Sequence, residues 1–154
     1  MVKEVPNKDV ARAINLVNSV FSEFVAPGYS EQGRNTFKSY LKDKLQEVSA
    51  DLKTGRKKMW AYYRGDEILG VIATQGSSHI SLMFVDKRHH WKGIARQMFC
   101  AVLEEIEQQS GNIKQVTVNS SPYAVKTYER LGFVKTDDEQ EKDGLIFVPM
   151  SRTV

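Results

Sequence analysis

A change in hydrophobic spacing at Met59 constrains the fold more than any other feature of the sequence. The stretches 59–64, 68–74 and 79–85 are rich in β-branched and aromatic residues, and two short polar turns that contain glycine separate them. Turns of this length join antiparallel strands, because parallel strands need a crossover of a dozen or more residues. This segment therefore predicts an antiparallel meander.

Two amphipathic helices are expected before the meander. Apolar residues recur at helical spacing over residues 7–24, and the sequence Ala-Pro-Gly at 26–28 then stops the pattern. A second helical pattern covers residues 30–55, with acidic and polar residues in its first turn. The chain thus begins with two helices.

Further helices and strands are expected after the meander. The helix over 123–131 has the clearest boundaries, because Ser121 and Pro122 form an N-cap followed by proline and Gly132 ends it. The acidic stretch 137–144 is too polar to be buried and predicts an exposed loop. The other expected elements are a helix from Ile94 to Ser110 and strands over 113–119, 133–135 and 145–150. The order α-α-β-β-β-α-β-α-β-β predicts an α+β fold on a mixed sheet.

The composition indicates a folded protein of ordinary size. Of the 154 residues, 41% are hydrophobic and 27% charged, so residues 1–154 are expected to form a single domain. No apolar run approaches the roughly 20 residues of a membrane span, and no signal-peptide pattern is seen, which predicts a cytoplasmic location without a membrane partner. The sole cysteine, Cys100, excludes an internal disulfide, and we expect no metal site. A net charge of +3 is too small by itself to indicate nucleic-acid binding.

A basic loop that contains glycine joins the last meander strand to the next helix. Lys87, Arg88, Lys92 and Arg96 place four positive charges within ten residues that contain no acid. At Gly93 the backbone can approach a ligand closely, and the free amides and dipole of the helix start favour phosphate. Taken alone, the same spacing also describes an ordinary glycine turn with a solvated basic rim.

A second motif lies about 25 residues further on, within the sequence 119–133. Together with the basic loop and the order of elements, it closely resembles the GNAT superfamily of acyl-CoA-dependent N-acyltransferases. The Gln/Arg-x-x-Gly-x-Gly/Ala signature of that family falls on residues 90–95. Its Tyr-x-x-x-Gly-Phe ending falls on Tyr128, Gly132 and Phe133. The two motifs fall on the strand-helix units where the family has them.

The resemblance covers about residues 56–150 and, more weakly, the two leading helices. It implies a mixed, mostly antiparallel sheet with helices on both faces, which opens into a V between the strands at 79–85 and 113–119. His90 departs from the family pattern, which usually has glutamine or arginine there and uses its side chain on phosphate. The backbone amides of the loop remain available for the same contact.

Acetyl-CoA is the acyl donor and co-substrate that the resemblance implies. Its pantetheine arm would pair along the strand at 83–85, its diphosphate would lie on the amides of 91–96, and Lys87, Arg88 and Lys92 would meet the other phosphates. Asn119 would order water or the amide backbone. The residues implied in binding acetyl-CoA are Met83, Phe84, Val85, His90, Trp91, Lys92, Gly93, Ile94, Ala95, Arg96 and Asn119.

The resemblance further implies direct attack of a primary amine on the thioester in a ternary complex. Tyr128 matches the tyrosine of the family and is the candidate general acid for the departing thiolate. His79 is the candidate base, because its pKa range suits proton removal and neither strand offers a carboxylate before its end. Residue type alone favours a core aromatic for Tyr128 and an ordinary surface residue at a strand edge for His79.

The acceptor is expected to be either a small amine or a peptide or protein amine, and the sequence does not separate these. Phe24, Tyr29 and Phe37 flank the turn between the first two helices, a region that often walls the acceptor site in the family. All three are equally suited to the core. If the acidic stretch borders the acceptor cleft, it would attract cationic amines. The resemblance also allows a homodimer, although the sequence shows no interface.

Two functions without catalysis remain open on the residues alone. A catalytically inactive protein that binds acyl-CoA would carry the same motifs. A basic nucleic-acid-binding module would use the clusters at 53–58 and 87–96 together with the aromatic residues Trp60, Tyr62, Tyr63 and Trp91. Trp60 and Tyr62 alternate with Tyr63 on the opposite strand face, which favours ordinary sheet packing, so nucleic acid is not the expected partner.

Overall fold

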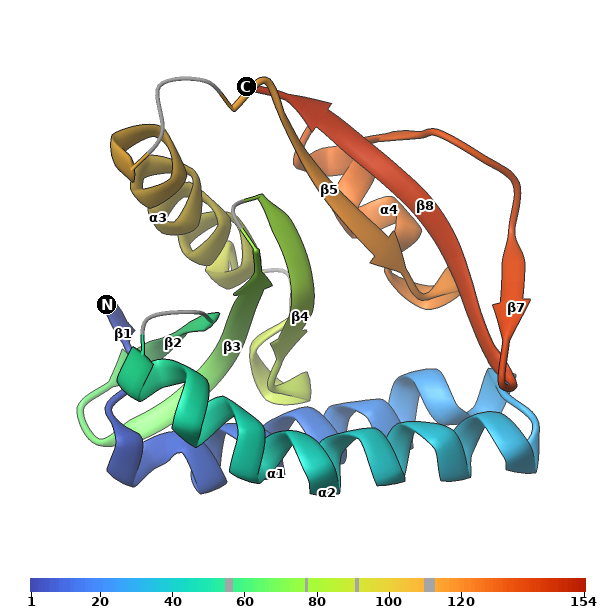
Figure 1. Cartoon of the computed structure of the whole chain (residues 1–154), viewed down its shortest axis with the longest axis horizontal. Coiled ribbons are helices and arrows are strands. Elements are labelled where there is room, and N and C mark those ends of the chain that lie inside the picture. Colours follow the sequence, from blue (N-terminus) through green and yellow to red (C-terminus); the bar gives the residue numbers. More distant parts are fainter. Residues whose placement is uncertain (55–56, 77, 91, 110–112) are drawn as a thin grey trace.

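The computed structural model describes residues 1–54, 57–76, 78–90, 92–109 and 113–154. Its centre is an eight-stranded sheet with the order β1-β2-β3-β4-β5-β8-β6, in which β7 pairs with β8 outside this path. Every neighbouring pair is antiparallel except β4 and β5, which run parallel. The expected mixed and mostly antiparallel sheet is therefore confirmed (Figure 1).

The strands that form the sheet differ widely in length. They are β1 (Val2–Glu4), β2 (Lys57–Arg64), β3 (Glu67–Gln75), β4 (His79–Val85), β5 (Gln115–Ser120), β6 (Val134–Lys135), β7 (Gln140–Lys142) and β8 (Leu145–Thr153). The α-helices are α1 (Val10–Val20), α2 (Glu31–Thr54), α3 (Ile94–Gln109) and α4 (Val125–Arg130). Short helical turns are η1 (Asn7–Asp9), η2 (Phe21–Val25), η3 (Ala26–Gly28), η4 (Lys87–His89) and η5 (Pro122–Ala124).

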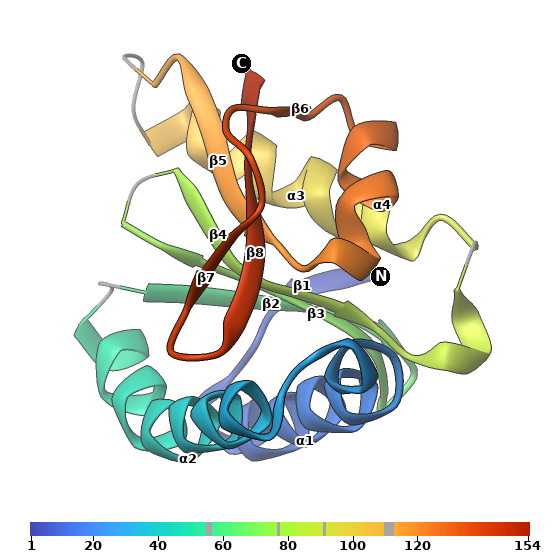
Figure 2. The ribbon, with the colours of Figure 1, turned by 90° about the vertical axis from the view of Figure 1, so that its right-hand side faces the viewer.

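Helices cover both faces of the sheet, as expected. In Figure 2, α1 and α2 lie on one side of the sheet and α3 and α4 on the other. The alternation of β2 explains this, because Met59, Ala61 and Tyr63 pack into the core cluster under α1 and α2, whereas Trp60 packs into the cluster under α3. Trp60 and Tyr63 are thus buried on opposite faces and are unavailable for stacking against nucleic-acid bases.

Two strands were missing from the predicted order of elements. The three residues of β1 pair with β2 at the edge of the sheet, and a strand this short leaves no periodic pattern. The three residues of β7 are polar and exposed, and they belong to the acidic stretch that predicted a loop. A tight turn at Asp143 (φ 53°) and Gly144 (φ 80°) joins β7 to β8. Asp-Gly is a strong hairpin signal, so the sequence did contain this element.

The first helical pattern is also broken up more than expected. Its regular part ends at Val20, and the next five residues form the π-helical turn η2 before the 3-10 turn η3. A π turn holds one residue more per hydrogen-bonded ring than an α turn, and such turns are frequent at functional sites. Here the turn brings Phe21 and Val25, both buried, to the wall of the cavity described below.

The parallel pair β4–β5 fixes the position of the site. The two strands pair only at His79↔Thr117 and Ile80↔Val118, and they diverge from there toward α1 and α2 (Figure 1). The register of β4 on β3 shifts between Ala73 and Thr74, which makes Ser81 an extra residue at the point of divergence. A bulge bends its strand and ends pairing, so the V-shaped opening follows from this local irregularity.

Candidate functional site

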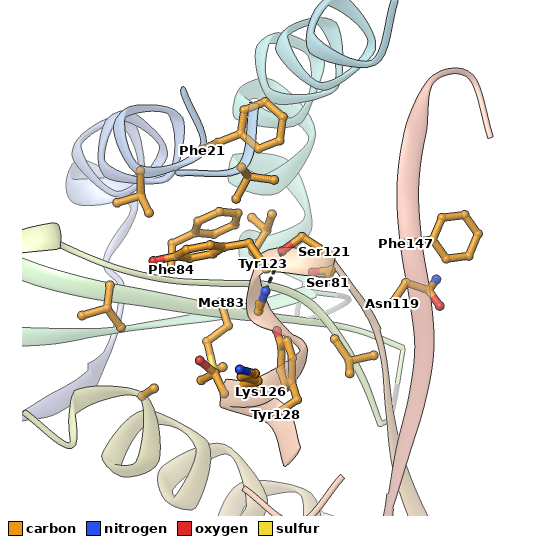
Figure 3. A pocket seen from close by; sticks show the side chains of 18 of the residues that line it. Phe21, Ser81, Met83, Phe84, Asn119, Ser121, Tyr123, Lys126, Tyr128 and Phe147 are labelled. Carbon is orange, nitrogen blue, oxygen red and sulfur yellow. Dashed lines mark hydrogen bonds between the residues drawn. The ribbon is translucent and has the colours of Figure 1, made fainter. Parts of the chain in front are cut away.

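A cavity of about 710 Å³ fills the opening between β4 and β5 (Figure 3). The strands supply its middle, with Ser81 to Val85 from β4 and Val118 and Asn119 from β5. One end carries positive or imidazole side chains and is called the cationic end: His89, His90, Arg96, Lys126 and Arg130. The other end is called the apolar end: Phe21, Val25, Tyr29, Phe37 and Leu145.

The inner edge of β4 offers backbone groups to a ligand. The N–H of Asp86 donates to the carbonyl of Leu69 on β3 at 2.8 Å. Because hydrogen-bonding directions alternate along a strand, the backbone groups of Met83 and Val85 face away from β3, into the opening. His90 already uses one of them, since its Nε2 lies 2.8 Å from the Val85 carbonyl oxygen. An extended chain with amide groups could pair along this edge as an added strand.

The cationic end combines a helix start with side-chain charge. Gly93 has φ 79° and precedes α3, and the N–H of Gln97 donates to its carbonyl at 3.1 Å. The amides of the first turn of α3 have no partner within that helix, which suits an anion. Arg96 donates to the carbonyl of Arg130 at 3.2 Å and so links α3 to α4.

Lys126 and Arg130 belong to the cationic end although sequence reasoning did not select them. They lie four residues apart on the helix that carries Tyr128, and both line the cavity. The signal was their i, i+4 spacing, which places two cations on one helix face. Lys92 is exposed and does not line the cavity, and Trp91 lies outside the described residues.

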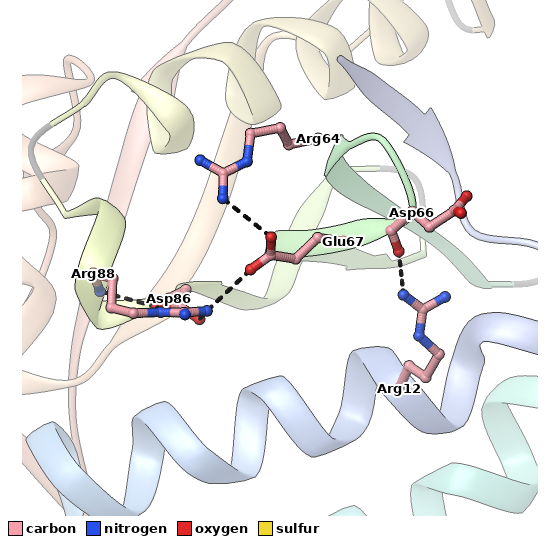
Figure 4. A network of polar contacts seen from close by, with 6 residues as sticks. All are labelled: Arg12, Arg64, Asp66, Glu67, Asp86 and Arg88. Carbon is pink, nitrogen blue, oxygen red and sulfur yellow. Dashed lines mark hydrogen bonds and ion pairs between the residues drawn. The ribbon is translucent and has the colours of Figure 1, made fainter.

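Lys87 and Arg88, expected to meet phosphate, instead form ion pairs with carboxylates. Lys87 Nζ lies 3.1 Å from Glu23 Oε1. Arg88 contacts Asp86 Oδ2 at 3.1 Å and Glu67 Oε1 at 3.0 Å, and Figure 4 shows Glu67 between Arg88 and Arg64. The hydrogen bond from Arg88 holds the pKa of Asp86 below its usual value. These two cations thus tie the loop to neighbouring elements.

Tyr128 stands in the middle of the cavity. The residue is 4% exposed, and its ring meets Phe133 edge-on with 5.4 Å between the centroids. In Figure 3 its hydroxyl points into the cavity. Burial raises the pKa of this phenol, so it keeps its proton at neutral pH. The two interpretations of Tyr128 are compatible, because it packs in the core and also presents its hydroxyl to the site.

The start of η5 and α4 is fixed by a cap. Ser121 Oγ accepts from the N–H of Ala124 at 3.2 Å, as the Ser-Pro sequence predicted. The buried Ser120 donates its hydroxyl to the Ser121 carbonyl at 2.7 Å. Asn119, just before this turn, is exposed and lines the cavity.

His79 lies away from the cavity. Its Nδ1 is 2.8 Å from Thr117 Oγ1, at the end where β4 and β5 are still paired. It is absent from the cavity lining found among the described residues. Burial lowers the pKa of its imidazole. The opening begins only after Ile80, so the structure does not bring this candidate base to the candidate acid.

The residues expected at the acceptor site lie in two places. Tyr29 and Phe37 line the apolar end, where Phe37 stacks on Phe21 with 3.7 Å between centroids. Phe24 lies outside the lining and packs against His90 (5.1 Å) and Tyr123 (5.6 Å). Phe24 therefore bridges the two sides of the opening.

Contacts between distant segments close the apolar end. The Tyr29 hydroxyl donates to the carbonyl of Ile146 at 2.7 Å, and burial together with the nearby Glu139 raises its pKa. The start of α2 packs directly on the β7–β8 turn, where a Cβ added to Gly33 would overlap the backbone of Gly144. The acidic stretch therefore does border this end of the cavity.

Other kinds of site find little support in the described ranges. The part of the chain that the structure describes contains no group of three or more His, Cys, Asp or Glu residues placed to hold a metal ion. Within the same ranges, no helix has both the length and the hydropathy of a membrane crossing. Of the basic cluster at 53–58, residues 55–56 lie outside the described structure.

The sequence comparison decides the family. Residues 25–154 match the profile of an acetyltransferase (GNAT) domain. The chain belongs to the GNAT acetyltransferase family. By family it is accordingly an acyl-CoA-dependent N-acetyltransferase. No curated protein matches the sequence.

Solved structures show the same fold at low sequence identity. A GCN5-related N-acetyltransferase from Rhodopseudomonas palustris has a TM-score of 0.83 and 16% identity, covering 100% of this chain and 95% of that chain. PaiA N-acetyltransferase from Thermoplasma acidophilum, in complex with coenzyme A, has a TM-score of 0.77 and 13% identity, with coverages of 100% and 98%. A chimera of spermidine N-acetyltransferase from Vibrio cholerae has a TM-score of 0.68 and 14% identity, with coverages of 99% and 94%. At these identities the likeness establishes the GNAT fold alone.

Proposed function

We propose that this GNAT protein transfers the acetyl group of acetyl-CoA to a primary amine by direct attack in a ternary complex. One observation carries the proposal: the free edge of β4 runs through a cavity with a cationic helix start at one end and the Tyr128 hydroxyl in its middle. An acyl-CoA has the matching parts, namely phosphates, an arm with amide groups and a thioester. The pantetheine arm and its thioester carry no charge, which suits the uncharged middle of the cavity.

Each part of the donor has protein groups that fit it. The diphosphate suits the amides at the start of α3, with Arg96 and Lys126 beside them. The pantetheine amides suit the backbone of Met83 and Val85. The imidazole of His90 competes for the Val85 carbonyl, so donor binding either accepts this arrangement or displaces the ring. We place the reaction in the cytoplasm, a reducing compartment that suits an unpaired cysteine.

The chemistry needs an amine without its extra proton. With a reference pKa of about 10.4, on the order of one alkylamine in 2,500 is neutral at pH 7, so desolvation or a water chain must assist. The amine nitrogen attacks the thioester carbon, and the backbone amides of β4 stabilise the oxyanion. The C–S bond then breaks, and Tyr128 protonates the departing thiolate sulfur. The nitrogen of the new amide still carries one extra proton, and transfer of this proton to the Tyr128 phenolate restores the phenol.

The acceptor is a small amine or a peptide amine. Water removes the amine proton in this mechanism, since His79 lies outside the cavity. A protein that only binds acyl-CoA would share the donor site but would have no turnover to lose when Tyr128 is changed. Substitution of Tyr128 therefore separates the two functions.

Calorimetric titration with acetyl-CoA tests the donor site directly. Gly93→Glu places a carboxylate in the anion site, and we expect it to weaken binding about tenfold or more. Gly65→Glu is the matched control, because Gly65 also has a positive φ and open space around it but lies in the β2–β3 turn. Equal binding by the two variants, or no binding of acetyl-CoA by the unchanged protein, would contradict the proposal. A short oligonucleotide serves as the second ligand and should give no saturable heat.

A further inference from the structure

The apolar end is enclosed by side chains that offer hydrocarbon rather than charge. Phe21, Phe37 and Val25 are each at most 9% exposed, and Phe21 meets Tyr29 edge-on with 5.5 Å between centroids. Leu145 adds an aliphatic side chain that packs against the same core cluster. An occupant of this end therefore gains contacts by presenting apolar surface.

Carboxylates are scarce where an acceptor with several charges would need them. Among the described residues that line the cavity, Asp143 is the sole carboxylate, and Lys142 lies next to it. Tyr29 already donates its hydroxyl hydrogen to the Ile146 carbonyl. A second ammonium group brought into this end would lose water, and the sole carboxylate that it could meet among these residues, Asp143, stands next to the competing cation Lys142. Polyamines and aminoglycosides therefore fit poorly.

The remaining acids of the stretch 137–143 lie outside the cavity itself. Asp137, Asp138, Glu139 and Glu141 are exposed and lie outside the cavity lining. Asp137 accepts from the N–H of Asp138 at 2.8 Å and from the side chain of Gln140 at 2.9 Å, which orders the turn before β7. Their negative field can attract a single ammonium toward the opening without binding it inside.

Contacts between α2 and the β7–β8 turn hold the wall of the apolar end in place. Thr36 donates its hydroxyl to the Asp143 carbonyl at 2.7 Å, beside the direct backbone contact of Gly33 with Gly144. Since α2 and the β7–β8 turn are held together here, the apolar end has a defined depth. A compact group is favoured over a long chain.

We propose that the acceptor is a primary amine on a compact aromatic or branched aliphatic body that carries no second positive charge. The inference rests on the proposed function and narrows its substrate class. Apolar surroundings lower the pKa of a single ammonium group, which supplies part of the deprotonation that the reaction needs. A free arylalkylamine and a peptide with an apolar first residue share this chemistry.

A panel of amines at saturating acetyl-CoA tests the substrate class. Pentylamine and 1,5-diaminopentane form the matched pair, because they differ mainly by the second ammonium group. We expect kcat/KM, followed as thiol release, to favour pentylamine by about tenfold or more, and 2-phenylethylamine to exceed both. Equal or better turnover of 1,5-diaminopentane or spermidine would overturn the inference. A comparison of kcat/KM for Phe-Ala-Ala amide and for 2-phenylethylamine distinguishes a peptide acceptor from a free amine.

A designed carboxylate provides a second test. Leu145→Glu adds a charge beside Asp143, and Leu145→Gln has the same shape without the charge. We expect the preference for pentylamine over 1,5-diaminopentane to fall about tenfold in Leu145→Glu and to stay near the wild-type ratio in Leu145→Gln. The same shift in both variants would contradict an electrostatic origin. Thermal melts identify a variant that fails to fold, in which case the wild-type panel decides.

Failure of this inference differs from failure of the proposed function. If acetyl-CoA does not bind in the calorimeter, the proposed function falls. If it binds but no amine in the panel is acetylated, the test becomes binding of 2-phenylethylamine to the protein saturated with CoA. Binding stronger than that of 1,5-diaminopentane supports the assigned class, and absence of binding at millimolar concentration overturns it.

Discussion

The two ends of the cavity are built in different ways. The cationic end comes from two short parts of the chain, residues 89–96 without Trp91 and Lys92 and residues 126–130, in which a helix start and charged side chains act together. The apolar end comes from segments more than a hundred residues apart, joined where Tyr29 contacts Ile146 and Gly33 contacts Gly144. Local sequence can therefore specify the proposed phosphate site, whereas the proposed acceptor wall forms only when distant segments of the chain pack together.

The largest expected effect comes from the residue between the two ends. Tyr128→Phe removes the proposed acid and keeps the ring that packs on Phe133. We expect kcat to fall about 10²-fold or more, with acetyl-CoA affinity unchanged within about twofold. Single-turnover rates and calorimetry measure the two quantities. Unchanged kcat would assign the proton to another donor and leave Tyr128 with its packing role.

The pH profile adds a second readout for Tyr128. Because burial raises its pKa above the usual value near 10, the phenol remains protonated up to and beyond that pH. The rate therefore should not decline near pH 10 through loss of this proton. A decline with an apparent pKa at the value of an exposed tyrosine, absent in Tyr128→Phe, would contradict the buried geometry.

Next in size is a change that disturbs the apolar end alone. A Cβ on Gly33 meets backbone of Gly144, which cannot move aside as a side chain would. Gly33→Ala should raise KM for the amine about tenfold and lower the free energy of unfolding by about 1 to 3 kcal/mol. Gly28→Ala is the control, because nothing lies within 4 Å of its added Cβ. Acetyl-CoA affinity should stay constant in both variants, and a loss of it would show that the ends are coupled.

The same contrast explains which features the sequence could predict. The meander, the basic loop, the Ser121 cap and Gly132 depend on local patterns, and the structure contains each of them. The pairing of Lys87 with Glu23 spans 64 residues and left no local trace. His79 looked suitable because strand position alone does not tell the paired end of β4 from the open end.

A third prediction concerns charge at the cationic end. Lys126 is exposed at the cavity, so neutralising it removes a screened attraction to phosphate. Lys126→Gln should weaken acetyl-CoA binding about fivefold at low salt and less at high salt, with KM for the amine unchanged. Lys135→Gln, which removes an exposed lysine of β6, is the control and should leave binding as it was. Equal loss in both variants would indicate a general charge effect rather than a contact at the cavity.

The smallest expected effect separates two cations of one basic motif. Arg88 lies eight residues before Arg96, but it contacts Asp86 and Glu67, so Arg88→Gln should leave acetyl-CoA affinity within about twofold. Its effect should be on stability. Arg88 holds the pKa of Asp86 below its usual value near 3.9, so its contribution is present above that pH and is lost as the pH falls through the lowered pKa. Melting temperatures of the two proteins should differ at neutral pH and converge in acid. A weaker affinity for acetyl-CoA would instead assign Arg88 to the proposed phosphate site. The ion pairs of Arg88 would then fail to separate it from Arg96, which lines the cavity.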